Sequence, residues 1–472
     1  MKVKCFVFCL VGLVATLVTF TTVTAKTVVN STAEEQAMVE LTVYNNNLAL
    51  VKDTRNVELP VGEGELNFMD VASHIMPVTV HARSLNYPED FTVLEQTYQY
   101  DLMSPDKLLE KYVGKKIKII NWNEFQDRQD IVEAILLSTH RGQIYKINDE
   151  IYLGYPGYKV LPGVPEDFVT EPTLKWSYEN RAEKAHKLEV SYLTTNINWK
   201  ADYVMILDED DTSSSISAWV TLDNESGVTY KNARLKLVAG KVHQVEETPG
   251  VYLMKSLAEA KIPQFEEKAF SEYHLYDLKR QTTIKNNETK QISLLRAFGV
   301  NTQKELLVYG TRNYFIEPYS EQTEKQPVSV YIKFKNSKEN NLGIPLPAGI
   351  VRVYKEENGS LQFIGEDRMQ HTPKDEEIRL KVGEAFDVVA ERIQTDYREI
   401  TSKLRESEWE ITIKNHKEKD VTVGIVEPLL GNWEIIKSTH PYQKVDAFTV
   451  RFEVNIPRNQ EIKVIYRVRV GL

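Results

Sequence analysis

Apolar and polar residues alternate with a period of two along most of the chain, which is the pattern of half-buried β-strands. The clearest example is the segment 188–207, LEVSYLTTNINWKADYVMIL, in which two alternating runs flank a short polar break. In the second run the alternation puts Trp199 and Tyr203 on one face and Asp202 on the other. We therefore predict two strands here, each with a packed face and a solvent face.

The same alternation continues to the C-terminus. Strands are expected within 216–222, 235–239, 291–295, 306–308, 328–334, 378–382, 409–413, 421–425, 448–454 and 462–468. Short, regularly spaced strands without intervening helices are typical of β-sandwiches. This predicts a central β-rich domain at 176–400 and an immunoglobulin-like C-terminal β-sandwich at 401–472. Residues 253–275, rich in Ala, Glu and Lys, predict a helical or flexible insertion in the central domain.

Residues 26–112 have a less regular pattern of short strands and predict an N-terminal β-rich domain. One helix is expected near its end, from Ser104 to Tyr112. Ser104 is a suitable N-cap, Pro105 fits the first helical position, and Gly114 fits the left-handed position after the helix.

Residues 113–175 hold short strands that are joined by tight polar turns such as Asn148-Asp149. A stretch rich in Pro and Gly follows them. This pattern predicts a small SH3-like barrel with its exit linker. The whole chain is thus expected to be mainly β and multi-domain, with few short helices.

Three segments share a weak internal repeat. VTLDNESGVTYKNARL, VYIKFKNSKENNLGIPL and ITIKNHKEKDVTVGIVEPL each run from an alternating strand into Asn, a polar loop and a second apolar run. The asparagines are Asn224, Asn336 and Asn415. Asn tolerates positive φ and hydrogen-bonds to nearby backbone, so it suits the end of a strand. Two interpretations stay open here, a true repeat and independent hairpins with similar turns.

The N-terminus has the pattern of a secretory signal over residues 1–25. Lys2 and Lys4 precede an apolar run at 6–20, and Val23-Thr24-Ala25 supplies small residues for cleavage. The alternative is an uncleaved anchor, but the apolar run is shorter than the ~20 residues that a span needs. No later segment is apolar enough to cross a bilayer, so no span is expected in the mature chain.

Cysteine usage and charge narrow the class of protein further. Both cysteines, Cys5 and Cys9, lie inside the predicted signal, so the mature chain has no disulfide and no cysteine metal ligand. This favours a bacterial protein that is secreted or resides in the periplasm or cell envelope. The formal net charge is −10, and it becomes −12 without the two lysines of the signal, which contains no acidic residue. An acidic chain argues against a nucleic-acid partner.

Motifs that carry chemistry are weak in this sequence. The nine histidines show no metal-ligand spacing, and no nucleophile elbow, phosphate loop or dinucleotide fingerprint occurs. No metal or cofactor is therefore predicted. Glu272, His274 and Asp277 place a titratable imidazole between carboxylates, which suits general acid-base work. The alternative is a half-buried strand whose histidine has a structural hydrogen bond.

Glu366 and Arg368 form a second candidate, an ion-pair site for a partner. The alternative is a solvated loop with local salt bridges, which contribute little to stability.

Several segments together resemble a known family. They are SYLTTNINWKADYV, DNESGVTYKNARLKLVAG, FSEYHLYDL, GIPLPAGIVRVYKEENGSLQFIGEDR, GEAFDVVAER, KNHKEKDVTVGIVEPLLGNWEI and HPYQKVDAFTVRFEVNIP. In this order they resemble secreted bacterial proteins with the domain of unknown function 4139, over about residues 185–472. The same region is similar to the C-terminal part of mucoidy-inhibitor-like proteins, whose long coiled-coil N-terminal half this chain lacks. The resemblance implies an exported β-rich protein and supplies no catalytic residues.

The leading hypothesis is an exported, non-enzymatic binding or scaffold protein of the bacterial cell envelope, with an envelope protein or a glycan as partner. The alternative is an envelope-polymer hydrolase or transferase whose dispersed site includes Glu272, His274 and Asp277. A third hypothesis is an assembly subunit whose strand edges pair with a partner.

Overall fold

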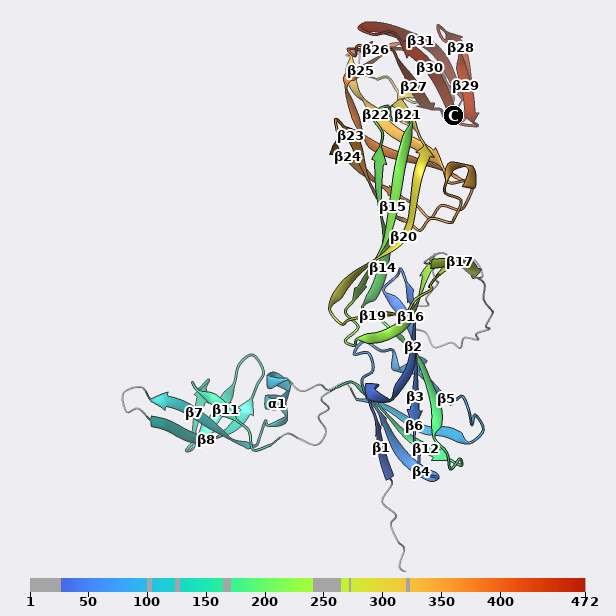
Figure 1. The fold of residues 1–472 in the computed structure, drawn as a ribbon. Coiled ribbons are helices and arrows are strands. Elements are labelled where there is room, and N and C mark those ends of the chain that lie inside the picture. The colour runs from blue at the N-terminus through green and yellow to red at the C-terminus, as the bar shows by residue number, and fades with distance from the viewer. Residues whose placement is uncertain are drawn as a thin grey trace, which may run out of the picture. The chain divides into compact units, whose positions relative to one another are not determined.

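The computed structural model describes residues 27–99, 104–123, 128–163, 171–240, 265–270, 273–319 and 323–471. The predicted mainly β, multi-domain fold is confirmed, since the described residues form several β-sheets and one α-helix (Figure 1). The chain divides into two compact units. Unit 1 contains residues 1–36, 55–71 and 82–189, and unit 2 contains residues 37–54, 72–81 and 190–472. Short 3-10 turns are η1 (Ala33–Glu35), η2 (Pro77–Thr79), η3 (Arg312–Phe315) and η4 (Lys338–Asn340).

A four-stranded sheet forms one part of unit 1. Its strands, in spatial order, are β1 (Thr27–Ser31), β4 (Gly62–Phe68), β12 (Thr173–Asn180) and β6 (Phe91–Gln99). Phe68, Trp176 and Tyr178 are buried on it. Because β6 and β12 are neighbours in space, the residues between them form an insertion into this sheet.

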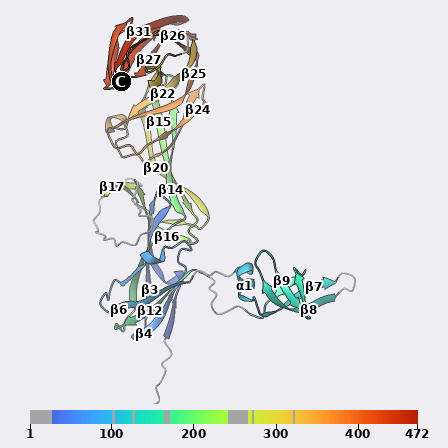
Figure 2. The ribbon, with the colours of Figure 1, turned by 180° about the vertical axis from the view of Figure 1, so that it is seen from behind.

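The insertion is a small module with its own core. It consists of α1 (Pro105–Lys111) and a sheet of order β10 (Glu150–Leu153), β9 (Ile144–Ile147), β8 (Arg128–Ser138), β7 (Lys116–Asn123) and β11 (Tyr158–Val160). Leu109 from the helix and Tyr112, its C-cap residue, pack on Ile117, Ile119 and their neighbours in the sheet. Figure 2 shows the module from behind.

The helix cap, the glycine after the helix and the hairpin turn of the module match the prediction. The sheet, however, does not close into the predicted barrel. Ser104 Oγ accepts the Lys107 N–H at 3.3 Å and caps α1, and Gly114 has a φ of +82°. Asn148 and Asp149 both have positive φ (47° and 72°), as a tight hairpin turn requires. The sheet stays open, because β10 and β11 are its two edges and do not pair.

Unit 2 begins with a sheet in which β17 (Phe265–Phe270), β18 (Tyr273–Leu278), β16 (Tyr230–Ala239), β2 (Gln36–Tyr44) and β3 (Leu48–Val57) lie in that order, and β19 (Thr282–Ile284) also pairs with β16. Two further strands, β5 (His81–Ser84) and β13 (His186–Thr194), each contain a boundary between the two units, after His81 and after Glu189. The helical insertion predicted at 253–275 is wrong for residues 265–270 and 273–275, which are strands because they extend the sheet at β16. Residues 253–264 lie outside the described residues.

The second sheet of unit 2 has the order β20 (Glu288–Asn301), β15 (Ser213–Asn224), β14 (Ile197–Leu207), β23 (Gly349–Glu357) and β24 (Ser360–Met369). Trp199 and Tyr203 are buried on its inner face. Trp199 Nε1 donates to the Val238 carbonyl (3.2 Å), and Tyr203 Oη donates to the Pro347 carbonyl (2.7 Å). The predicted two-face reading of this segment is therefore confirmed.

The third sheet of unit 2 has nine strands. Their order is β28 (Asn432–Ser438), β31 (Gln460–Gly471), β26 (Leu404–Asn415), β25 (Glu377–Thr401), β22 (Glu324–Lys335), β21 (Gln303–Tyr309), β27 (Val421–Pro428), β30 (Thr449–Ile456) and β29 (Tyr442–Asp446). The C-terminal sandwich therefore includes strands from before residue 401. The two edge strands β28 and β29 follow each other in sequence, and Trp433 Nε1 reaches the Ala447 carbonyl at 2.8 Å.

Buried asparagines at strand ends share one hydrogen-bonding arrangement. The side-chain amide donates to two or three main-chain carbonyls, and the side-chain oxygen accepts a nearby N–H. The residues are Asn180, Asn224, Asn336 and Asn415. None of them has positive φ, so the amide and not the backbone conformation explains their position. The predicted repeat thus corresponds to a shared structural device, which Asn180 extends to unit 1.

We predict that Asn415→Ala lowers the free energy of unfolding by about 2–3 kcal/mol, because it leaves buried carbonyls without a donor. Asn415 Nδ2 donates to the carbonyls of Lys419 (2.9 Å), Ile456 (3.1 Å) and Pro457 (3.1 Å). Urea denaturation monitored by fluorescence measures the change. The control is Asn455→Ala on the exposed face of β30, and equal effects of the two variants would contradict the prediction.

Candidate functional site

The first predicted site is not assembled on one face. His274 and Asp277 lie on β18, but the strand alternation puts them on opposite faces. His274 shares the face of buried Tyr276, whereas Asp277 pairs in register with Lys236. Glu272 lies outside the described residues. The hydrolase hypothesis built on these three residues stays a prediction from the sequence.

A group that resembles a catalytic triad occurs in unit 1. His186 Nδ1 lies 2.9 Å from Ser84 Oγ, and His186 Nε2 lies 2.9 Å from Asn180 Oδ1. A hydroxyl, an imidazole and an orienting group in a line are the arrangement of a nucleophile with its base. All three side chains are buried, however, and Ser84 Oγ also accepts the Tyr87 N–H at 3.2 Å. The group therefore connects β5, β12 and β13 and does not present a nucleophile to solvent.

A buried ion pair in the nine-stranded sheet is also structural. Arg392 Nη2 lies 2.6 Å from Glu427 Oε1, and both side chains are almost fully buried. Arg392 Nε donates to Gln326 (3.0 Å), and the guanidinium lies over the rings of Tyr314 (4.9 Å) and Trp409 (5.6 Å). A buried guanidinium needs this many partners, because an unpaired charge in the interior is very costly.

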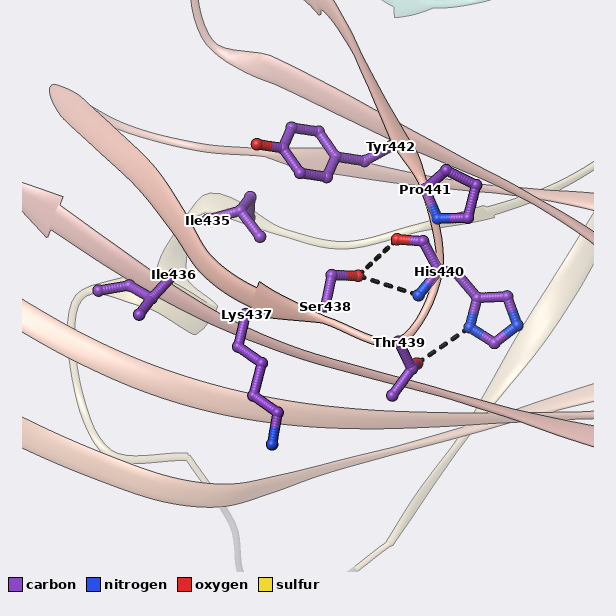
Figure 3. A pocket seen from close by; sticks show the side chains of 8 residues that line it. All are labelled: Ile435, Ile436, Lys437, Ser438, Thr439, His440, Pro441 and Tyr442. Atoms are coloured by element: carbon purple, nitrogen blue, oxygen red, sulfur yellow. Dashed lines mark hydrogen bonds between the residues drawn. The ribbon is translucent and has the colours of Figure 1, made fainter.

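A shallow hollow beside the loop between β28 and β29 has a volume of about 510 Å³ and is lined by residues 435–442 (Figure 3). Its polar groups bond to each other. Ser438 Oγ donates to the His440 carbonyl (2.7 Å) and accepts the His440 N–H (3.2 Å), while Thr439 Oγ1 lies 2.9 Å from His440 Nδ1. These contacts explain the shape of the loop and do not point to a ligand.

The outer face of the β20-β15-β14-β23-β24 sheet carries a continuous line of polar side chains, here called the polar row. Its members come from all five strands. They are Gln291, Thr221, Asp202, Arg352 and Glu366.

Hydrogen bonds and ion pairs connect the polar row from one edge of the sheet to the other. Gln291 Nε2 donates to Thr221 Oγ1 at 3.2 Å, and Thr221 Oγ1 donates to Asp202 Oδ2 at 2.7 Å. Arg352 then joins Asp202 and Glu366, each with an N–O distance of 3.3 Å. Asp202 is shielded, whereas Glu366 is half exposed, so the row is accessible toward β24.

Trp219 stands on the same face. It pairs in register with Asp202 of β14 and with Ser293 of β20, and Asp202 pairs in turn with Ile350. Arg368 of β24 is the register partner of Ile350 and completes this second line across the sheet. Trp219 is half-buried. The sheet therefore brings the second predicted pair, Glu366 and Arg368, onto one face with an aromatic ring that the sequence prediction did not include.

A signal for Trp219 was present in the sequence. Ile216, Ala218, Val220 and Leu222 alternate as the buried face of β15, so the residue between Ala218 and Val220 must face outward. Trp219 lies beside Asp202 because β15 pairs with β14 in this register. Periodicity within one strand does not specify that pairing.

The comparisons with known proteins agree with the motif resemblance. A family model described as domain of unknown function (DUF4139) matches residues 188–470. The chain belongs to the DUF4139 family. A comparison with curated proteins found no match. The polar row, Trp219 and Arg368 all lie within the DUF4139 region, whereas Ser84, His186 and the small module lie outside it.

The described residues contain neither a metal-binding cluster nor a helix suited to a membrane. No group of three or more His, Cys, Asp or Glu side chains in this part of the chain is arranged to hold a metal ion. Over the same residues, no helix combines the length and apolarity that crossing a bilayer demands.

We predict that His186 makes stability depend on pH. Burial lowers the pKa of His186, although the charge of Asp90 opposes this shift. The unfolded chain therefore binds more protons at this residue than the folded chain. His186 therefore makes its full contribution to stability above the ordinary histidine pKa of ~6.5. This contribution decreases as the pH falls below that value.

Urea denaturation at about pH 7.5 and about pH 5.5 measures this effect. His186→Gln should reduce the difference in unfolding free energy between the two pH values. The control is His140→Gln, a change at an exposed turn, which should keep the wild-type difference. An unchanged pH dependence in His186→Gln would show that another group causes it.

Proposed function

We propose that this DUF4139 protein is an exported, non-enzymatic binding protein of the bacterial cell envelope, and that its outer sheet face binds a neutral glycan. The observation that carries the proposal is the polar row beside Trp219. It combines a half-buried aromatic ring with hydrogen-bonding groups that hold one another in place on one sheet.

The chemistry of this face suits a sugar ring. A pyranose has an apolar C–H surface, which can stack on an indole ring, and a rim of hydroxyl groups, which can donate and accept hydrogen bonds. Asp202 and Glu366 offer acceptors, while Arg352 offers donors. Hydrogen bonds to charged groups are stronger than those between neutral groups.

Charge pairing within the polar row favours a neutral ligand. The guanidinium of Arg352 already lies between the carboxylates of Asp202 and Glu366, with both N–O distances at 3.3 Å. A charged ligand would compete with these pairs, whereas hydroxyl groups can add to them. The same pairing favours binding over catalysis, because each charged group is held by its partner.

We predict that Trp219→Ala weakens binding of a neutral oligosaccharide by about tenfold or more, which corresponds to ~1.4 kcal/mol. The probes are defined soluble oligomers of N-acetylglucosamine, glucose and mannose, tested by isothermal titration calorimetry with the mature chain. Arg352→Gln should also weaken binding, because it removes the charge-assisted donor.

The matched control is Tyr442→Ala, which removes an exposed aromatic ring from the nine-stranded sheet and should leave affinity unchanged. Circular dichroism should confirm that each variant is folded. The proposal fails if none of these oligomers binds, or if Trp219→Ala binds them as well as the wild type.

A further inference from the structure

The small module presents a second exposed face that is unlike the polar row. The outer side of its five-stranded sheet exposes large apolar side chains, with Tyr158 81 %, Ile131 57 % and Trp122 52 % accessible. Val160 is exposed beside them. The inner side of the same sheet is covered by α1 and by the core of the module.

Strand register shows that these side chains adjoin one another. Tyr158 of β11 pairs with Ile120 of β7, and Ile120 pairs with Ile131 of β8, so the three side chains form one row. Trp122 follows Ile120 on the same face of β7, two residues further on. We call Trp122, Ile120, Ile131 and Tyr158 the apolar cluster.

Basic residues continue this face on β7. Lys118 and Lys116 follow Ile120 with the same period of two, and both are exposed. Lys118 pairs in register with Val160 on one side and with Glu133 on the other. The apolar cluster therefore borders a basic strip with a single carboxylate across it.

The charge of the module differs from that of the chain as a whole. Residues 104–163 contain nine Lys and Arg against eight Asp and Glu, which is a net charge of +1, whereas the chain carries −10. The basic strip is thus located on a module that does not share the net negative charge of the whole chain.

We propose that the apolar cluster and its basic strip dock the protein on an anionic lipid surface. Tyr and Trp rings favour the boundary between lipid and water, because one end of each ring system is apolar and the other end is polar. Isoleucines can enter the acyl boundary beside them, and lysines on a basic strip attract acidic headgroups.

The exposure of the apolar cluster favours a lipid surface over a small ligand. A small-molecule site surrounds its ligand with concave walls. The apolar cluster has the opposite form, since Tyr158 exposes most of its surface on a three-residue edge strand. The proposal goes beyond the glycan-binding face and does not depend on it.

Co-sedimentation of the mature chain with vesicles tests the proposal. The probes are vesicles of phosphatidylcholine alone and of phosphatidylcholine mixed with phosphatidylglycerol. Binding to the mixed vesicles should be about tenfold tighter or more and should weaken as salt is added. No binding, or equal binding to both vesicle types, overturns the proposal and assigns the cluster to a protein partner.

Two double variants test whether the apolar cluster and the basic strip contact the vesicle. The double variant Ile131→Ser with Tyr158→Ser should lose about tenfold or more in vesicle affinity, and so should Lys116→Glu with Lys118→Glu. The control is Phe386→Ser, which removes an apolar side chain that is 93 % exposed in unit 2, and it should bind as the wild type does. Equal affinity of the double variants and the wild type overturns the proposal.

A second measurement does not depend on the folding of the variants. Brominated lipids quench indole fluorescence on contact, so they should quench the wild-type chain in mixed vesicles. Conservative Trp122→Phe should remove most of this quenching while vesicle binding persists. Quenching that persists in Trp122→Phe would place the lipid contact elsewhere and overturn the assignment.

Discussion

Buried loop carbonyls are the constraint on which this fold depends. Where a strand ends inside a packed β-structure, the following loop leaves carbonyls that water does not reach, and each needs a donor. A side-chain amide at the end of the strand supplies two donors and one acceptor at once. Asn180, Asn224, Asn336 and Asn415 meet this need in the same manner, and each joins its own loop to a second segment. These amides thus anchor the loops in both units.

Sequence periodicity predicted the faces of single strands well, because alternation depends only on neighbouring residues. It placed Trp199 and Tyr203 in the core and Asp202 outside, and the structure agrees. It could not predict pairing between distant strands. The open sheet of the small module, the strands at 265–270 and 273–278, and the contribution of β21, β22 and β25 to the last sheet all depend on such pairing.

The difference between alternation within a strand and pairing between strands also explains which candidate sites the sequence could predict. Glu272, His274 and Asp277 are close in sequence, yet alternation separates the two described members. Glu366 and Arg368 are two residues apart on one strand, so alternation keeps them on one face. Their neighbours Asp202 and Trp219 come from strands more than a hundred residues away, and only the register brings these residues together. Residue type alone would have favoured Ser84 and His186, whose burial excludes them.

The side-chain groups described above fall into two classes, which differ in exposure and in charge pairing. Arg392 with Glu427, and His186 with Asn180, are buried and bond to each other within the fold. The polar row and the apolar cluster face solvent on different sheets and suit different ligands, one a hydroxyl-rich ring and the other a lipid boundary. Two modest contacts on one chain reinforce each other, because the first raises the effective concentration of the second. Such reinforcement arises only where the proposed glycan is attached to the proposed lipid surface, because only then is the second contact intramolecular.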